Sequence, residues 1–342
     1  MFTERTRPPR EGTITATPAP RSARAAPPLG DLAGAADEAA VLLARARATP
    51  GASQANREGG HVGSDGSRRS LVRHLANYAA AATFAEQHRA AGHGGPADAN
   101  HGGGQPRVRQ PRGGQPWGDA GHGGTIVDVG SGVGALAAWL AHRLGSDLTL
   151  VDADPLVRRV TSAAFPHVGV EAHLDAVPDG SAALVTAMEV VEHVVAAAQP
   201  RFVAALRAKV APGGLLVLST PDESGYPRGW SGYAPHVGVL DAAGFERLLR
   251  GHAGPDATVW RLEGEVFTLD AFRRLLHPVV NRVWGRVAGA VPGACHTLGG
   301  WATGVLGRVR PGGEVRTDDV HLVRPAEGSG TGLLGVVRVP AD

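Results

Sequence analysis

The sequence predicts an α/β fold in which a mostly parallel sheet carries helices on both faces. Three observations lead to this prediction: a buried strand that runs into a glycine-rich turn, short apolar runs that alternate with helical patterns, and brief connections between them. The stretch 125–140 reads TIVDVGSGVGALAAWL, in which the apolar and β-branched residues of a strand precede three glycines and a helical pattern. We expect the other elements to be arranged around this turn.

Strand and helix patterns alternate on the carboxyl side of this stretch. After the strand at 125–129 and the helix that ends at 144, the sequence predicts strands at 147–151, 168–174, 183–190 and 214–220, and helices at 155–164 and 199–210. It then predicts a helix at 241–249, a strand pair or bent strand at 258–267, and strands at 320–323 and 333–339. Ligands of such sheets bind where the parallel strands end, so we expect the functional residues there.

Composition shifts divide the rest of the chain. The Pro-rich and Arg-rich region 1–30 has too few large apolar groups to form a core. The stretch 31–48 that follows it has the apolar periodicity of an amphipathic helix. The expected divisions are a disordered tail with one short helix at 31–48 (1–68), the N-terminal helix of the folded domain (69–90), a flexible low-complexity insertion (91–124), the core (125–267), a C-terminal helical cap (268–316), and closing strands (317–342).

Composition and charge restrict the classes of function. The 342 residues are 43% hydrophobic, which suffices for one large domain or two small ones. The net charge of +2 and the scattered arginines give no strong support for nucleic-acid binding. Cys295 is the only cysteine, so no intrachain disulfide can form. The N-terminus lacks the apolar core of a signal peptide, and no run suits a membrane span, so we expect a cytoplasmic protein.

The glycine turn at 130–134 has the properties of a nucleotide-binding turn. Glycines let the backbone bend sharply and let a ligand approach the main chain, and free N–H groups at the start of the next helix favour polar or anionic ligand atoms. The turn also satisfies a loose GxGxxA dinucleotide fingerprint, which is weak by itself. Asp152 ends the next strand about 20 residues further on, where a carboxylate can hold ribose hydroxyls.

With the later segments AMEVVEHV (187–194) and APGGLLVLSTP (211–221), the chain resembles class I S-adenosylmethionine-dependent methyltransferases. The resemblance implies a Rossmann-like, seven-stranded, mostly parallel sheet whose last strand is antiparallel, and S-adenosyl-L-methionine as the methyl donor. By position in the family motifs, the implied donor-binding residues are Asp128, Gly130, Ser131, Gly132, Gly134, Asp152, Ala153, Asp175, Ala176 and Glu189. Glycines of the turn would accommodate the methionine portion, Asp152 the ribose, and Asp175 with Ala176 the adenine.

Glu189, Glu192 and His193 form the most distinctive polar cluster. Their spacing of i, i+3 and i+4 would place all three on one side of a helical turn. Two carboxylates and an imidazole on one face can bind a divalent cation, which would lower the pKa of a bound hydroxyl. Small-RNA 2′-O-methyltransferases are similar here and add a later histidine, for which His236 is the best match. The same run also resembles ubiquinone-biosynthesis O-methyltransferases, in which a catalytic metal need not follow. Without a metal, His193 or His236 would act as the general base, and a purely structural role for Glu189 and His193 stays open.

The acceptor is less constrained by the sequence than the donor. We expect O-methylation of a small molecule or saccharide, such as a glycan or the redox-cofactor glycan mycofactocin. Methylation of an RNA 3′ end is a rival, but 222–224 reads DES where an asparagine-containing run is expected, and no dense basic or aromatic platform follows. A non-catalytic, cofactor-binding interaction module is a second rival, and a nicotinamide oxidoreductase is the weakest.

Overall fold

The computed structural model describes the helices and strands that surround one large sheet. Predictions for the N-terminal 25 residues, for most of the 91–124 insertion and for the 268–316 cap fall outside the described residues, and the division into domains stays a prediction. The described residues are 26–52, 68–92, 124–226, 229, 231, 233–267 and 316–341.

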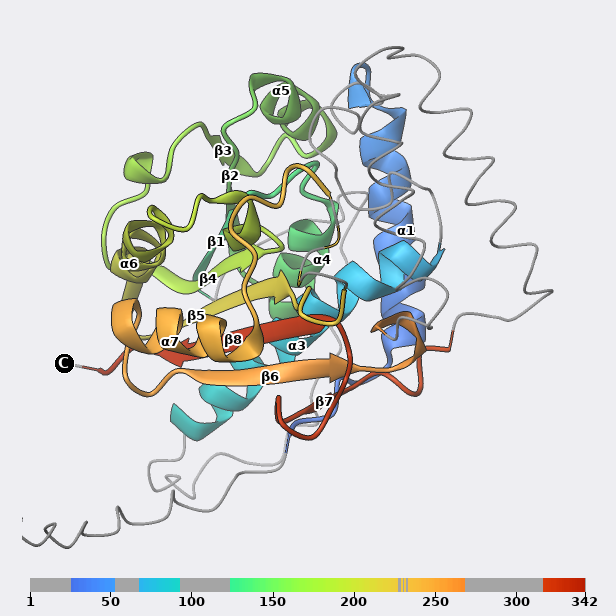
Figure 1. Ribbon diagram of the computed structural model, residues 1–342. Helices are drawn as coiled ribbons and strands as arrows, with labels where there is room; N and C mark the ends of the chain where they lie inside the picture. The colour runs from blue at the N-terminus through green and yellow to red at the C-terminus, as the bar shows by residue number, and fades with distance from the viewer. Residues whose placement is uncertain are drawn as a thin grey trace, which may run out of the picture.

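The sheet has eight strands rather than the expected seven. In spatial order they are β3 (Gly169–Glu171), β2 (Asp147–Val151), β1 (Thr125–Val129), β4 (Ala182–Met188), β5 (Val210–Pro221), β8 (Gly332–Arg338), β6 (Thr258–Glu263) and β7 (His321–Val323). Figure 1 shows this order from β3 at the top to β7 at the bottom. Neighbours among the first five strands are parallel, whereas β8 is antiparallel to β5 and β6. This confirms the mostly parallel sheet and its antiparallel last strand.

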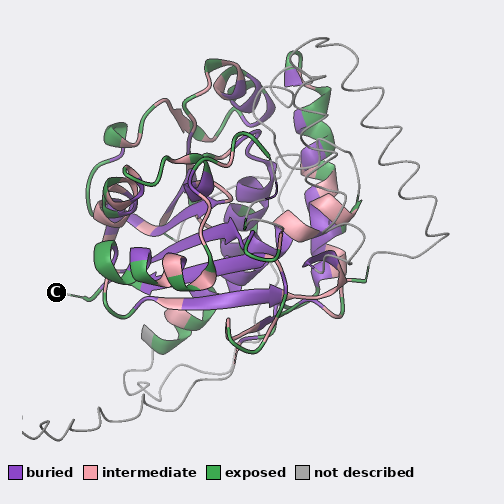
Figure 2. Ribbon diagram, in the orientation of Figure 1, coloured by how far each residue is buried: buried purple, intermediate pink, exposed green. Residues whose placement is uncertain are grey.

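Helices cover both faces of the sheet. On one face lie α3 (Arg68–Gly92), α4 (Ala135–Leu144) and α5 (Pro155–Ala164), with α1 (Leu32–Ala48) packed on these helices, and on the other face lie α6 (Gln199–Lys209) and α7 (Ala242–His252). Successive strand residues alternate between the two cores: Ile126 faces the first and Val127 the second. The central strands β1, β4 and β8 are accordingly buried along most of their length (Figure 2).

Local signals set several helix ends. The Asp154 side chain accepts hydrogen bonds from the N–H groups of Leu156 and Val157, and Pro155 occupies the first turn of α5. Asp31 caps α1 in the same way through Gly34. Helix α1 packs against α3, α4 and α5, because Leu32, Leu43 and its buried alanines join the core on that face. No helix of the described ranges has the length and apolar character needed to cross a bilayer.

Three expected elements are shorter than predicted. The third strand ends at Glu171, and Leu174–Ala176 forms a 3-10 turn. The fourth ends at Met188, and the region expected as a strand pair is β6 followed by the 3-10 turn Glu265–Phe267. Both early ends occur at the carboxyl edge of the sheet, and the residues that follow β4 line a cavity there.

Candidate functional site

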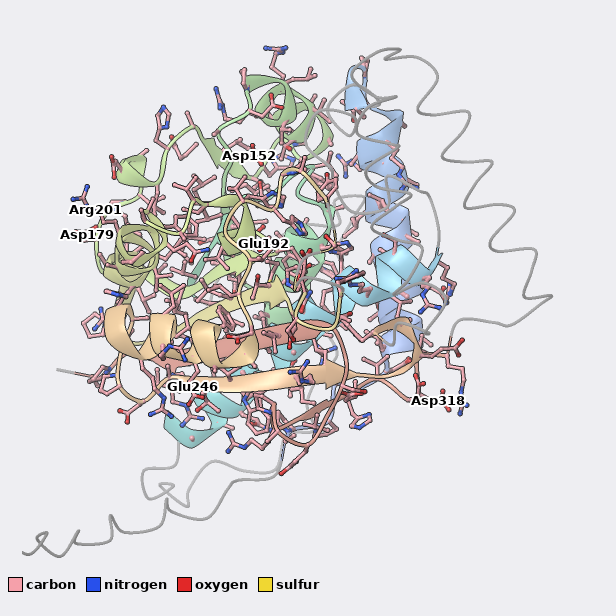
Figure 3. All side chains as sticks on the ribbon, in the orientation of Figure 1. Asp152, Asp179, Glu192, Arg201, Glu246 and Asp318 are labelled. Atoms are coloured by element: carbon pink, nitrogen blue, oxygen red, sulfur yellow. The ribbon has the colours of Figure 1, made fainter. Side chains whose placement is uncertain are left out.

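A cavity of about 680 Å³ lies at the carboxyl ends of β1, β2, β4 and β5. Its volume is in the range of small-molecule sites. The glycine turn and Asp152 form one part of the wall, and Glu189, Glu192, His193 and His236 form another. Figure 3 labels Asp152, which directly follows β2, and Glu192, which lies on the 3-10 turn after β4.

The glycine turn is packed too tightly for side chains. Gly130, Gly132 and Gly134 all have positive φ, between 54° and 73°. A Cβ on Gly130 would lie 2.5 Å from a methyl group of Val190, and one on Gly134 would lie 2.6 Å from Leu150. The turn therefore presents its backbone directly to the cavity, as the sequence predicts.

Asp152 ties this turn to the end of β2. One carboxylate oxygen accepts a hydrogen bond from the Gly132 N–H at 3.0 Å, and the other accepts from the Asp154 N–H at 2.9 Å. The side chain is only half-buried and lines the cavity, so it can also accept hydrogen bonds from a ligand. The adjoining Ser131 and Ala153 line the cavity as well.

Asp128 lies behind the turn instead of on the cavity wall. It is fully buried, and it accepts hydrogen bonds from the Thr186 hydroxyl at 2.6 Å and from the Tyr78 hydroxyl at 3.2 Å. Burial raises the pKa of Asp128 to about 7, although these two hydrogen bonds oppose the shift. Asp128 therefore does not line the described cavity, and its expected role in donor binding stays a prediction.

Asp175 and Ala176 do not line the described cavity. Both are exposed on the 3-10 turn that follows β3. Their expected contact with adenine stays a prediction.

Glu189 does not share a helix face with Glu192 and His193, contrary to the expectation from their spacing. Its φ of 57° is left-handed, which is rare for a non-glycine residue, and the 3-10 turn begins only at Val191. The Glu189 carboxylate accepts a hydrogen bond from the Ser219 hydroxyl at 3.2 Å and lies 3.6 Å from the Arg73 guanidinium. Glu189 is thus directed toward the wall formed by α3.

Glu192, His193 and His236 do come together. Each offers one ligand atom, and these atoms lie within 4.8 Å of one another. Oε2 of Glu192 accepts a hydrogen bond from the Thr220 hydroxyl at 3.2 Å, whereas buried Oε1 has no hydrogen-bond partner and lies 3.9 Å from Nε2 of His193. Burial and the nearby charge of Glu189 raise the pKa of Glu192 well above its usual value. Three of the four predicted metal ligands therefore form a group, and Glu189 lies outside it.

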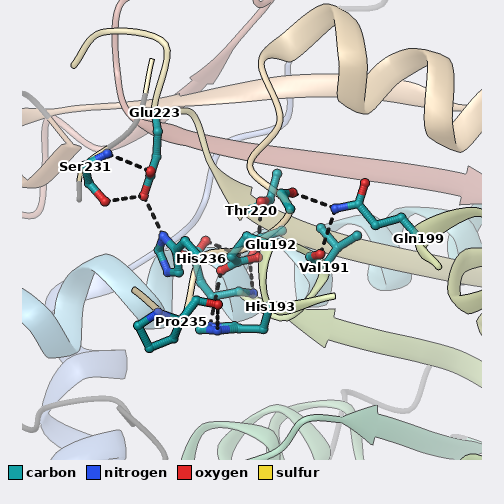
Figure 4. A network of polar contacts seen from close by, with 12 residues as sticks. Val191, Glu192, His193, Gln199, Thr220, Glu223, Ser231, Pro235 and His236 are labelled. Carbon is teal, nitrogen blue, oxygen red and sulfur yellow. Dashed lines mark hydrogen bonds and ion pairs between the residues drawn. The ribbon is translucent and has the colours of Figure 1, made fainter. Parts of the chain in front are cut away.

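The His236 ring belongs to a second polar group, shown in Figure 4. Its Nδ1 lies 2.5 Å from the buried carboxylate of Glu223, which also accepts hydrogen bonds from the Ser231 N–H and hydroxyl. Glu223 follows β5 by two residues, and His236 lies in the loop before α7. Sequence analysis missed Glu223, because nothing local links it to a histidine 13 residues away.

Helices α1 and α3 supply a wall that the sequence only partly indicates. Leu43, Arg73, His74 and Tyr78 line the cavity from these helices. Burial and then the charge of Arg73 lower the pKa of His74 to about 3, so His74 is neutral near pH 7. The resemblance predicts that the helix before the first strand lines the pocket, and reading its polar residues at helical spacing could have identified Arg73 and His74.

The described lining is rich in acidic groups. It contains one arginine, Arg73, beside six carboxyl groups: Asp152, Asp154, Glu189, Glu192, Asp222 and Glu223. Asp222 is paired with Arg261 at 2.8 Å, and Glu189 faces Arg73. Such a lining favours cationic and hydroxyl-bearing ligands over polyanions.

Comparisons with known proteins agree with the motifs. The family model described as "Methyltransferase domain" matches residues 108–277. A ribosomal protein L11 methyltransferase from Pelotomaculum thermopropionicum is 39% identical over 105 residues, which are 28% of this chain and 32% of that protein. The match thus spans about a third of this curated relative.

Solved structures of low sequence identity also align with the chain. A sarcosine dimethylglycine methyltransferase structure from Galdieria sulphuraria aligns with 66% of this chain and 81% of its own, at 13% identity and a TM-score of 0.39. Phosphoethanolamine N-methyltransferase 2 of Haemonchus contortus, in complex with phosphomonomethylethanolamine and S-adenosylhomocysteine, aligns with 66% of this chain and 51% of its own, at 13% identity and a TM-score of 0.40.

The family match covers the glycine turn, the acid that follows β2 and the EVVEHV segment, and the sheet is mostly parallel with an antiparallel last strand, as the resemblance implies. The chain therefore belongs to the class I S-adenosylmethionine-dependent methyltransferases.

Proposed function

We propose that this protein transfers the methyl group of S-adenosylmethionine to a hydroxyl group of a small molecule or saccharide. The observation that carries the proposal is the layout of the cavity, which joins the glycine turn and Asp152 to His193 and His236 in one space. A donor whose amino-acid end lies on the turn and whose ribose lies on Asp152 would direct its sulfonium toward the histidines.

The reaction needs alignment and one proton acceptor. The hydroxyl oxygen of the acceptor attacks the methyl carbon, the carbon–sulfur bond breaks, and S-adenosylhomocysteine leaves with the electron pair of that bond. The hydroxyl proton passes to a base, for which His236 is our first choice and His193 our second. Glu192 and Glu189 would hydrogen-bond to the acceptor and to the donor amino group respectively, and Asp175 with Ala176 would contact the adenine.

A divalent cation at Glu192, His193 and His236 is a second possibility for the same wall. The buried Oε1 of Glu192 without a hydrogen-bond partner, beside two imidazoles, is a donor set that suits Zn²⁺ or Mn²⁺. A bound cation would supply Lewis-acid activation of the acceptor hydroxyl. Titration of the chelator-treated protein with each metal chloride, followed by calorimetry, would detect such a site, and Glu192→Gln should abolish the heat of binding.

The acidic lining makes an RNA end a less suitable acceptor than a neutral or cationic molecule. An RNA enzyme should bind oligonucleotides with strong salt dependence, whereas we expect weak binding at all salt concentrations. A saccharide such as the redox-cofactor glycan mycofactocin fits the proposal, and a cytoplasmic location would be consistent with it.

The decisive experiment uses S-adenosylmethionine with a labelled methyl group. The purified protein is incubated with this donor and with a metabolite extract of its host, with and without chelator, and labelled products are identified by mass spectrometry. A labelled small molecule whose fragmentation places the labelled methyl group on oxygen and not on nitrogen supports O-methylation. Tight donor binding with no labelled product from any fraction would instead indicate a non-catalytic module.

A further inference from the structure

Both oxygens of the Glu223 carboxylate, which follows β5 by two residues, contact other residues of the protein. Its side chain is 3% exposed. Oε2 accepts a hydrogen bond from the Ser231 N–H at 2.8 Å, and Oε1 accepts from the Ser231 hydroxyl at 2.7 Å and faces Nδ1 of His236 at 2.5 Å (Figure 4). Each oxygen of Glu223 therefore has a specific partner. Of these partners only His236 is ionisable, and its ring lines the cavity.

The chemistry of these partners determines where the proton of His236 lies. An ionised carboxylate can only accept hydrogen bonds, so the contact with Nδ1 requires an N–H at that nitrogen. Both oxygens of Glu223 also accept hydrogen bonds from Ser231, Oε2 from its N–H and Oε1 from its hydroxyl, as the oxygens of an ionised carboxylate do. A neutral imidazole that carries its proton on Nδ1 has its lone pair on Nε2.

The ring is also held in orientation by its neighbours. The rings of His193 and Tyr233 both meet His236 edge-on, with centroids 4.9 Å away and interplanar angles of 77° and 90°. The His236 side chain is 15% exposed, and the residue lines the cavity. With Nδ1 turned to Glu223, the opposite edge of the ring is the one left for a ligand.

We propose that Glu223 is a positioning residue that fixes His236 as the Nδ1–H tautomer and leaves Nε2 as the proton acceptor for the substrate hydroxyl. The catalytic consequence rests on the proposed function, whereas the tautomer does not. Ser231 completes the arrangement, because its two donors hold the carboxylate plane while Nδ1–H binds a second lone pair of Oε1.

Glu223→Gln reverses this arrangement without changing side-chain size. The amide oxygen must take the place of Oε2, because the Ser231 N–H can only donate, and the amide nitrogen then takes the place of Oε1. An NH₂ group there donates to Nδ1, which requires the Nε2–H tautomer. The Ser231 hydroxyl can turn to accept from the same NH₂ group, so both amide hydrogens have an acceptor.

The test is ¹⁵N NMR of protein labelled on histidine, in mildly alkaline buffer and without donor or acceptor. Two-bond correlations between ring nitrogens and ring protons distinguish the two tautomers and the imidazolium, and His236→Asn assigns the signals. We expect Nδ1–H in the wild type and in Glu223→Asp, and Nε2–H in Glu223→Gln. Glu246→Gln, which removes an exposed carboxylate on α7, is the matched control and should leave the spectrum unchanged.

The wild-type spectrum alone can overturn the proposal: an Nε2–H tautomer or an imidazolium contradicts it even if Glu223→Gln does not fold. An unchanged tautomer in folded Glu223→Gln contradicts it as well. With an acceptor from the labelling experiment, Glu223→Gln should lower kcat by about 10²-fold or more while KM for the donor stays constant. If the tautomers are as expected but no methyl transfer occurs, the proposed function fails and the positioning role stands.

Discussion

Replacing Asp152 by alanine tests whether the cavity binds the donor as we propose. The carboxylate has two tasks in the structure: it holds the Gly132 N–H and the Asp154 N–H, and it has surface left toward the cavity. Ribose offers two neighbouring hydroxyls, each of which can donate to one carboxylate oxygen. Alanine removes the ligand contacts and the two internal hydrogen bonds together.

The expected loss of affinity follows from these contacts. A hydrogen bond to a charged group contributes about 1.5–3 kcal/mol, and the half-buried position of Asp152 favours the lower end. Two lost contacts then cost about 3 kcal/mol, which corresponds to an increase of about two orders of magnitude in Kd. Loosening of the Gly132 backbone adds to this value, so Asp152→Asn, which keeps one acceptor oxygen, should bind more tightly than Asp152→Ala.

Isothermal titration calorimetry with S-adenosylmethionine and S-adenosylhomocysteine measures this change. Asp147→Ala is the matched control, because Asp147 is exposed at the opposite end of the same strand. Thermal unfolding by circular dichroism checks that each variant is folded. If folded Asp152→Ala bound the donor as tightly as Asp147→Ala does, the ribose assignment and the reasoning behind it would be wrong.

Three further predictions concern the glycine turn and the buried polar side chains near it. Gly134→Ala places a Cβ 2.6 Å from Leu150 at a φ of 73°, so we expect a loss of about 1–3 kcal/mol in the free energy of unfolding and weaker donor binding, by urea titration and calorimetry. Thr186→Val removes the 2.6 Å hydrogen bond to Asp128 and should cost about 1–3 kcal/mol, and a variant as stable as the wild type would contradict this. Because its folded-state pKa of about 7 exceeds its usual value, Asp128 should stabilise the fold most below about pH 4 and lose this contribution as the pH rises to about 7. His74, whose pKa is lowered to about 3, should act oppositely and destabilise the fold as the pH falls below about 6.5. Urea unfolding across this pH range measures both contributions. Relative to the wild type, the stability of Asp128→Asn should rise more with pH, because this variant lacks the Asp128 contribution. The stability of His74→Gln should fall with pH relative to the wild type, because this variant lacks the His74 contribution.

Elements with strong local signals were predictable from the sequence. The strand at 125–129, the helix that ends at 144, and the next strand and helix have the predicted bounds. Glycine at the turn, Pro155 after an N-cap aspartate, and Gly145 at the end of α4 each act within a few residues. Such signals need no knowledge of the remainder of the chain.

Features that depend on contacts between distant residues were not predictable. The helical spacing of Glu189, Glu192 and His193 suggested one face, but the left-handed backbone at Glu189 and the 3-10 turn after it separate the first residue from the other two. The pairs Tyr78–Asp128 and Glu223–His236 bring together residues 50 and 13 positions apart. No local periodicity encodes such pairs, and the metal and base roles in the EVVEHV segment accordingly stay predictions.

The position of α1 and α3 has a practical consequence for work on this protein. The family model begins at residue 108, whereas Leu43, Arg73, His74 and Tyr78, all on the cavity wall, come from these two earlier helices. A protein shortened to the matched residues would keep the glycine turn and the histidines but would lose that wall and the hydroxyl that Tyr78 donates to Asp128. Searches for the acceptor should therefore use the whole chain, since a truncated version could reject the right molecule.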